Sequence, residues 1–302
     1  MKNILVAIAL TLPTIALGQL NSMPGTLLWG VTNSKGDTSY LFAVFHEFGN
    51  SFLDQFPETK CHRSARCIVL EALPDKASKI RLAKNWVKDL SKADYTLIDN
   101  YMHQLNLGYS LKQARRIPAS WLCYALLSEL YKRQCGVWTK LDVIEMEGYL
   151  ANSTITFKKE LYGLESNKDT FNVVNTMMNN ADNDDTAGIR LLKDIVLNER
   201  KYLDSVAQEC WEADNYKALK IDYKFSKRSE EDDPAFPLFL DKRNDAWLPR
   251  LTSIIDTSTA FVAVGMKHLF YQKGLIVQLR ERGYHVFPIE MHKTELRYKR
   301  QK

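Results

Sequence analysis

The sequence lacks the short motifs that identify several large enzyme classes. It contains no G-x-S-x-G segment, no phosphate-binding loop of the Walker type and no G-x-G-x-x-G segment. A serine hydrolase of that class, a P-loop enzyme and a dinucleotide-dependent enzyme are therefore disfavoured. The segment that begins at His46 is not the zinc-protease motif H-E-x-x-H either, because the second histidine is absent.

Long apolar runs are also lacking, apart from one at the N-terminus. Residues 1–3 are a short positive start, residues 4–17 are mostly apolar, and small residues end the run at Gly18. This pattern is typical of a secretory signal peptide, and the run is shorter than the about 20 residues of a membrane-spanning helix. We expect a signal peptide at 1–18 and a periplasmic or secreted mature protein with no membrane span.

Cysteines are few, and no two of them have C-x-x-C spacing, so neither a zinc ribbon nor a thioredoxin motif is indicated. An exported protein meets an oxidising compartment, where disulfides form. Cys61–Cys67 and Cys123–Cys135 are the locally plausible pairs, and they leave Cys210 free. The spacing does not fix the connectivity. We expect at least one intramolecular disulfide, and Cys123–Cys135 in preference to Cys61–Cys67.

Signatures of nucleic-acid binding are absent as well: there is no helix-turn-helix, zinc-finger or RNA-binding motif. The net charge is +5, and part of it lies in the tail at 292–302, which is typical of a solvated chain end. We therefore expect no nucleic-acid partner. A chain of 302 residues suits one large domain or two small ones, and we favour a single domain over 19–302.

What the sequence does contain is the pattern of a mixed α/β fold. Two β-type runs at 26–31 and 38–46 are separated by turn residues and predict a hairpin. Near the C-terminus, a strand, a loop, a helix at 274–282 and a second strand form a βαβ unit, which favours parallel pairing of the two strands. Further strands are expected at 67–70, 154–157, 161–164, 259–264 and 284–289.

The middle of the chain is predicted to be mostly helical. A polar loop at 179–185 lacks the glycine and the terminal glutamate of an EF-hand, so we interpret it as a solvated turn. The acidic stretch at 226–237 is the clearest linker. Helical segments are expected at 75–134, at 142–150, on both sides of the polar loop between 169 and 216, and at 238–255. The fold class is therefore α/β, with a mixed, partly parallel sheet and a large helical middle section.

Four polar residues stand at the ends of four apolar runs: His46, Glu71, Glu165 and His268. In open α/β sheets, ligands bind beyond the carboxyl ends of the strands, so these side chains are expected to converge. Two imidazoles and two carboxylates suit a divalent metal ion or general acid–base catalysis. The alternative is that each is an unrelated capped or solvated residue.

The other histidines lie in weaker contexts and are expected to be structural or exposed: His62, His103, His285 and His292.

Several segments, taken in order along the chain, resemble the TraB/PrgY/GumN family, which includes the Tiki-type proteases. Residues 28–31 and 39–46 are similar to the family's first G-x-x-H strand. Residues 69–71 match its acidic strand end, and residues 163–165 match its G-L-E segment.

The C-terminal part carries the most specific likeness. Arg243 and Asn244, followed by Trp247, match the family's R-N helix. Residues 261–268, and the segment that follows them, closely match the second G-x-x-H motif.

The resemblance implies a metal-dependent hydrolase related to erythromycin-esterase-like and ChaN-like proteins, with a peptide or protein as the suspected substrate. His46 and His268 would be the metal or catalytic histidines, and Glu71 and Glu165 their acidic partners.

Arg243 and Asn244 would line or brace the site. A divalent ion is the implied cofactor, and zinc, manganese and cobalt are not distinguished, because mixed nitrogen and oxygen ligands suit several ions. The oligomeric state is not indicated.

Two positions depart from the family pattern. Ala43 stands where the first motif has glycine, and the glutamine that often follows the G-L-E segment is absent from 166–171. If the backbone at Ala43 needs a positive φ, alanine costs about 1 kcal/mol, whereas a glycine kept for close approach would cost only space. These departures support one alternative, a non-catalytic protein that binds a peptide, a metal or haem on the same scaffold. A further alternative, an accessory factor in surface-polysaccharide production, is implied by the resemblance alone.

The strand-end placement also predicts how two variants behave. His46→Ala and His268→Ala are expected to abolish metal binding or activity and to leave the fold intact, because a polar residue at a strand end contributes little core packing.

Overall fold

The structure is a computed structural model, and it describes residues 25–73, 85–138, 142–166, 169, 185–221 and 240–294. Four of the sequence predictions fall outside these residues, wholly or nearly so: the signal peptide at 1–18, the polar loop up to 184, the linker at 226–237 and most of the C-terminal tail. No helix in the described ranges has both the length and the apolar character needed to cross a bilayer.

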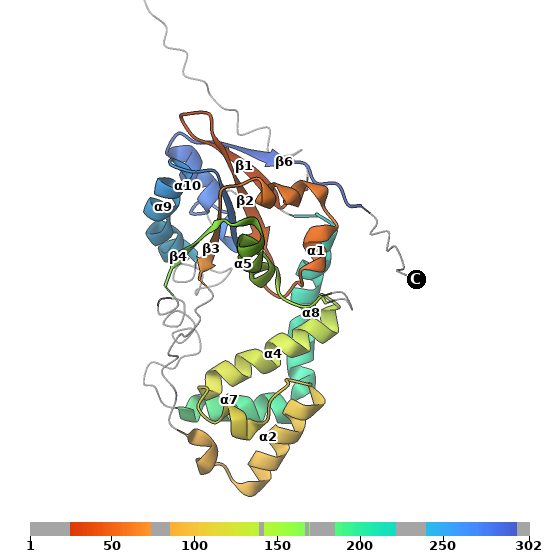
Figure 1. Cartoon of the computed structure of the whole chain (residues 1–302). Coiled ribbons are helices and arrows are strands. Elements are labelled where there is room, and N and C mark those ends of the chain that lie inside the picture. Colours follow the sequence, from red (N-terminus) through yellow and green to blue (C-terminus); the bar gives the residue numbers. More distant parts are fainter. Residues whose placement is uncertain are drawn as a thin grey trace, which may run out of the picture.

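A six-stranded mixed sheet forms one end of the molecule, with the order β4–β3–β5–β2–β1–β6 (Figure 1). β4, β3, β5 and β2 are parallel to one another, whereas β1 is antiparallel to both β2 and β6. The carboxyl ends of the four parallel strands therefore lie along one edge of the sheet. The strands are β1 (Leu28–Thr32), β2 (Thr38–Val44), β3 (Cys67–Ala72), β4 (Glu160–Glu165), β5 (Ala260–Gly265) and β6 (His285–Ile289).

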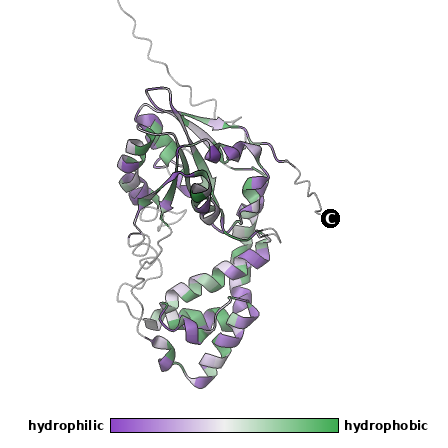
Figure 2. Ribbon diagram, viewed as in Figure 1, coloured by the Kyte–Doolittle hydropathy of each residue, from purple (hydrophilic) through white to green (hydrophobic). Residues whose placement is uncertain are grey.

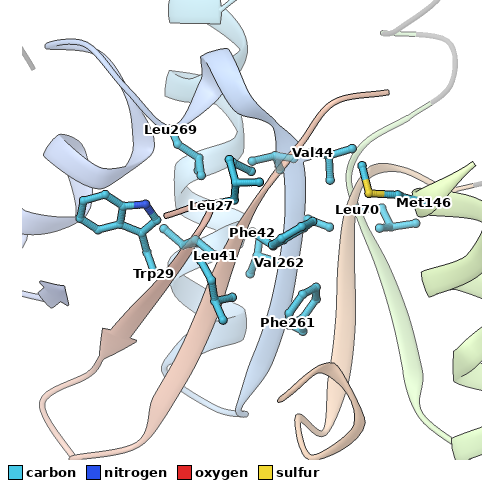
Figure 3. Close-up of a cluster of buried hydrophobic side chains, with 14 of the residues drawn as sticks. Leu27, Trp29, Leu41, Phe42, Val44, Leu70, Met146, Phe261, Val262 and Leu269 are labelled. Atoms are coloured by element: carbon cyan, nitrogen blue, oxygen red, sulfur yellow. The ribbon is translucent and has the colours of Figure 1, made fainter. Parts of the chain in front are cut away.

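The core of the sheet is built around β5, whose six residues are all buried. A strand that is covered on both faces reads as a continuous apolar run, and β5 has the sequence AFVAVG. Phe261 stacks on Phe42 of the neighbouring β2, with ring centroids 5.8 Å apart. Figure 3 shows these two rings among the aliphatic side chains of the sheet, including Leu41 and Val262.

Helices make up the rest of the molecule. Buried apolar side chains within the described residues form two clusters, one around the sheet and one among α2, α3, α4 and α7 (Figure 1). Figure 2 shows hydrophilic and hydrophobic residues alternating along these helices, as expected for helices with one buried face. The helices are α1 (Ser51–Asp54), η2 (Pro57–Arg63), η3 (Trp86–Asp89), α2 (Lys92–Gln104), α3 (Leu111–Ala114), α4 (Ala119–Cys135), α5 (Met146–Phe157), α7 (Asp185–Leu197), α8 (Glu199–Lys217), α9 (Lys242–Ile255), η5 (Met266–His268) and α10 (Leu275–Glu281).

The C-terminal end of α8 joins the helical part to the sheet. Tyr216 is fully buried, and its hydroxyl donates a hydrogen bond to the carbonyl oxygen of Ala43 at 2.7 Å. The Tyr216 ring packs against Phe45, Phe48 and Phe52, with centroid distances of 5.4, 5.0 and 4.9 Å. Aromatic pairs at such distances contribute about 0.5–1.5 kcal/mol beyond their buried area. This cluster fixes the chain immediately before His46.

The disulfide joins Cys135 to Cys210, so the expected preference for Cys123–Cys135 is wrong. Both cysteines of the expected pair belong to the straight helix α4. Twelve residues of helix separate their Cα atoms by about 18 Å, whereas a disulfide needs them within about 7 Å. Cys210 lies on α8, which packs against α4 and brings its Cα to 4.8 Å from that of Cys135. The other three cysteines are free: Cys61, Cys67 and Cys123.

Two further expectations are corrected. Residues 154–157 belong to α5, which begins at Met146, and do not form a strand. Met146, Leu150 and Thr154 recur at helical spacing and are buried, and this packing overrides the β propensity of the Thr-Ile-Thr-Phe segment. The last two strands run in the same direction but do not pair, because β2 and β1 lie between β5 and β6.

Candidate functional site

The four predicted strand-end residues come together at one edge of the sheet. His46 follows β2, Glu71 lies near the end of β3, and Glu165 is the last residue of β4. His268 ends the short turn η5 that follows β5. Because these strands are parallel neighbours, His46 and His268 reach the same edge although they are 222 positions apart in the chain.

Glu71 lies between the two histidines. Its Oε1 atom is 3.7 Å from Nε2 of His46 and 3.8 Å from Nε2 of His268. The backbone N–H of Gly265 donates a hydrogen bond to the same Oε1 at 2.7 Å. Burial acts to raise the pKa of the Glu71 carboxyl. Interactions with His268 and His46, then with Arg243 and the Gly265 N–H, outweigh burial and lower this pKa to about 2.

Arg243, in the first turn of α9, links three of the other site residues. Nη2 donates to Oε2 of Glu71 and to Oε1 of Glu165, both at 2.7 Å, and Nε donates to Oε2 of Glu165 at 3.1 Å. Nη1 lies 3.1 Å from Nε2 of His268. The guanidinium also stacks over the ring of Trp247, with 4.5 Å between its Cζ and the ring centroid. The Arg243 guanidinium therefore connects Glu71, Glu165 and His268.

Asn244 fixes the ring of His268. Its Nδ2 donates to the carbonyl oxygens of His268 and Lys273, at 3.0 and 2.8 Å, so its Oδ1 is left to accept from Nδ1–H of His268 at 2.7 Å. Arg243 has only N–H groups to offer, so the contact at Nε2 requires a lone pair on that atom. The hydrogen bonds thus select the neutral tautomer of His268 with its proton on Nδ1.

Glu165 is held more tightly than Glu71. Its carboxylate is 7% exposed and accepts the two hydrogen bonds from Arg243 and a third from Nε1 of Trp247 at 2.8 Å. The same Trp247 ring packs on His268 with centroids 4.3 Å apart. Glu165 therefore serves to hold Arg243 and Trp247 in place beside His268.

Gly265 provides the space in which His46 and Glu71 meet. A Cβ atom built on Gly265 would lie 2.8 Å from Nε2 of His46 and 3.1 Å from Oε1 of Glu71. Real Cβ atoms essentially never come closer than 3.0 Å to another heavy atom. The glycine of the second G-x-x-H motif is thus needed for close approach, and its φ of −50° shows that no left-handed backbone is involved.

Ala43, at the corresponding position of the first motif, lies in ordinary strand backbone. Four residues other than glycine have a positive φ within the described part of the chain, and Ala43 is not one of them. Alanine is therefore unstrained there, and the first of the two explanations for glycine at this position does not apply to this chain.

Glu147, which no sequence pattern indicated, contacts His46 directly. Nδ1 of His46 and Oε1 of Glu147 form a short hydrogen bond. Glu147 lies in the first turn of α5, whereas the sequence placed the start of that helix several residues earlier and gave no strand-end signal. Burial acts to lower the pKa of His46. The charge and hydrogen bond of Glu147, followed by the charges of Glu71 and Glu47, outweigh burial and raise this pKa to about 10.

The two site histidines differ in burial. The side chain of His46 is 49% exposed, whereas His268 is 3% exposed and fully hydrogen-bonded at its ring. The premise that a strand-end residue contributes little packing does not hold for His268, because its imidazole packs on Trp247 and satisfies the buried Asn244.

The remaining histidines lie away from this edge of the sheet. His62 is buried, with Nδ1 donating to the carbonyl oxygen of Thr59 at 2.8 Å. The other three are exposed: His103, His285 and His292.

The donor atoms are of the types that bind divalent ions. Two donors on a tetrahedral ion with bonds of about 2.0–2.1 Å lie about 3.4 Å apart, close to the separations of Glu71 Oε1 from the two Nε2 atoms. However, in the described residues no group of three His, Cys, Asp or Glu side chains is arranged as a ready ion site. At His268, an N–H of Arg243 occupies the Nε2 lone pair. Binding an ion requires Arg243 to give up that one contact.

Comparison with known proteins gives one match. The sequence model of the TraB/PrgY/gumN family matches residues 27–288, a range that includes every site residue described above. No curated protein and no solved structure matches the chain. The likeness to erythromycin-esterase and ChaN-like proteins therefore stays a prediction.

Proposed function

The chain belongs to the TraB/PrgY/gumN family, and on that premise we propose that it is an exported metal-dependent hydrolase that cleaves peptide bonds. The observation that carries the proposal is the position of Glu71 Oε1, 3.7 and 3.8 Å from the Nε2 atoms of two histidines that come from different strands. Nothing in the packing of the sheet requires two imidazoles and a carboxylate to face one another.

His46, His268 and Glu71 would hold the ion through Nε2, Nε2 and Oε1. A divalent ion bound there would lower the pKa of a bound water and polarise the scissile carbonyl. Zinc, manganese and cobalt all suit this donor set. The low pKa of Glu71 keeps its carboxylate ionised, which a ligand needs, and Asn244 keeps the His268 proton on Nδ1, away from the ligating atom.

Arg243 has a second role in this proposal. Its contact with His268 is lost when Nε2 becomes a ligand, but its two hydrogen bonds to Glu165 hold the guanidinium in place. The released Nη1–H then faces the site and can donate to an anionic oxygen that develops on the substrate. Glu165 acts by fixing Arg243, so of the two acidic residues Glu71 is the one we assign to direct contact with the ion.

Export is supported by two independent features. The N-terminal residues 1–18 have the composition of a signal peptide, and Cys135 and Cys210 form a disulfide, which is stable in oxidising compartments. A periplasmic or secreted location is therefore part of the proposal.

The test uses the oxidised, exported protein as purified. Metal analysis is expected to find close to one equivalent of a divalent ion, and a peptide-library screen is expected to find cleavage that stops on chelation and returns with the ion. His46→Ala is the matched control, since its side chain is half-exposed and its loss should spare the fold. Absence of any bound ion after incubation with zinc, manganese and cobalt would contradict the proposal.

A second function has one observation in its favour. Because Arg243 donates to Nε2 of His268, the site is a closed hydrogen-bonded network without an ion. A non-catalytic protein that captures a peptide, a metal or haem on this scaffold would show binding in the same assays and no cleavage of any library member.

A further inference from the structure

Within the described residues, the Glu147 side chain forms a hydrogen-bonded ion pair with His46. Its Oε1 pairs with Nδ1 of the imidazole, while its Oε2 is buried and has no hydrogen-bond partner in the described part of the chain. Burying a carboxylate oxygen without a partner costs free energy. A residue kept at such a cost usually has a role beyond packing.

The start of α5 is attached to the loop that follows His46, so Glu147 and His46 are held in register. The N–H of Met146 donates to the carbonyl oxygen of Phe48 at 3.2 Å, and the N–H of Asn50 donates to that of Ile144 at 3.0 Å. The side-chain oxygen of Asn50 accepts from the backbone N–H groups of Val143 and Ile144.

Gly49 allows this close attachment. A Cβ atom built on Gly49 would lie 2.1 Å from the side chain of Asp142, whose Oδ1 accepts from the N–H of Ser51 at 2.7 Å. Segments 46–51 and 142–147 are therefore held together, which limits how far the side chains of His46 and Glu147 can move apart.

We propose that Glu147 is the positioning residue of His46: its carboxylate holds the Nδ1 proton of the imidazole and so directs Nε2 toward Glu71 and His268. Asn244 orients His268 in the same way, because its Oδ1 accepts a hydrogen bond from Nδ1–H of His268. The two histidines would thus be oriented by two different residues, a carboxylate and an amide, from two different helices. The inference rests on the proposed function only in the use of Nε2 as an ion ligand.

The competing explanation is an ordinary surface ion pair. Such pairs contribute little to stability and nothing to a site. Glu145 provides a matched control, because it lies two residues away at the same helix end, is 48% exposed and pairs with Lys132 at 3.3 Å. Removing it deletes the same type of side chain without touching His46.

The first measurement is calorimetric titration of the metal-free mature protein with zinc. Glu147→Ala is expected to raise the Kd by about 10–100-fold, the usual effect of losing the residue that orients a ligating histidine. Glu147→Gln should recover most of the affinity, because its amide oxygen still accepts from Nδ1–H. Glu145→Ala should bind as the unaltered protein does. Equal affinity of Glu147→Ala and the unaltered protein would overturn the proposal.

The second measurement does not depend on an ion. Nitrogen-15 spectra of the imidazoles, with His46 assigned by its loss in His46→Ala, report which nitrogen carries the proton once the ring is neutral. We expect Nδ1–H in the unaltered protein and in Glu147→Gln, and a mixture of tautomers in Glu147→Ala. A neutral His46 with its proton on Nε2 in the unaltered protein would refute the inference. If the protein binds none of zinc, manganese and cobalt, the proposed function fails and these spectra alone decide the role of Glu147.

Discussion

Substituting Gly265 by alanine is expected to weaken ion binding at the site while leaving the stability of the fold nearly unchanged. The residue has φ −50° and ψ 136°, which alanine adopts without strain. The substitution also reduces the conformational entropy of the unfolded chain, which stabilises the fold by about 0.4–1 kcal/mol where the site is compatible. The backbone therefore gives no reason to expect loss of structure.

The added methyl group acts on the donor atoms instead. It would lie 2.8 Å from His46 Nε2, and ordinary contact begins at 3.4 Å, so the imidazole must move by the difference, 0.6 Å. The corresponding difference for Glu71 Oε1, at 3.1 Å, is 0.3 Å. Metal–ligand distances tolerate only about 0.2 Å. The displaced imidazole is expected to leave the position in which its Nε2 lies 3.7 Å from Glu71 Oε1.

We therefore expect the free energy of unfolding of Gly265→Ala, measured by urea titration, to lie within about 1 kcal/mol of that of the unaltered protein. The entropic gain from replacing glycine and the cost of the new steric contact oppose each other and are each of about that size. We also expect its Kd for zinc to rise at least about tenfold, as for other displacements of a ligating group. Calorimetry and denaturation on the same sample give both numbers. Unchanged zinc affinity in a folded Gly265→Ala protein would refute the assignment of His46 and Glu71 to one site.

Three other outcomes are expected. His46→Ala and His268→Ala should both lose zinc binding, and His268→Ala should destabilise the fold by about 1–3 kcal/mol, because it leaves a buried amide oxygen without its donor; an unfolding midpoint of His268→Ala equal to that of the unaltered protein would contradict this. Thiol titration of denatured, oxidised protein should find three free cysteines, and Cys210→Ser should cost about 2–4 kcal/mol; five free thiols would disprove the Cys135–Cys210 bond. Because the pKa of Glu71 falls from 4.5 to about 2 on folding, the unfolded chain binds more protons below pH 4.5, and about 3 kcal/mol of stability should be lost between about pH 4.5 and 2. The difference in free energy of unfolding between the unaltered protein and Glu71→Gln should therefore shrink over that range, and a constant difference would refute the shift.

The predictable part of the site is the part carried by strand ends. A buried strand such as β5 reads as an apolar run, and the first polar residue after it stands where parallel strands present their ligands. His46, Glu71, Glu165 and His268 were found in this way, and the structure brings all four to one edge. The hairpin of β1 and β2 was likewise predictable from its turn residues.

The remaining features depend on contacts between distant segments. Glu147 lies in the first turn of a helix and differs from other helical glutamates only in its contact with His46. The hydrophobic periodicity of the sequence therefore did not indicate it as a site residue. Cys135 and Cys210 are 75 residues apart, and the packing of α4 on α8 selects that pair over the shorter spacing. The position of β6 beside β1 is also tertiary, since a βαβ pattern gives strand direction but not the neighbour.

The strand order has a consequence for how the protein is made. β5 begins at residue 260 and fills the place between β2 and β3, which are complete by residue 72. A growing chain that has not yet reached β5 leaves one edge of each of these earlier strands without its native hydrogen-bonding partner. Unpaired strand edges favour association between chains, and sheets closed by such distant partners fold slowly. The histidine pair cannot assemble before almost nine-tenths of the chain has been synthesised, so premature stops far downstream of His46 should yield aggregating products with no residual activity.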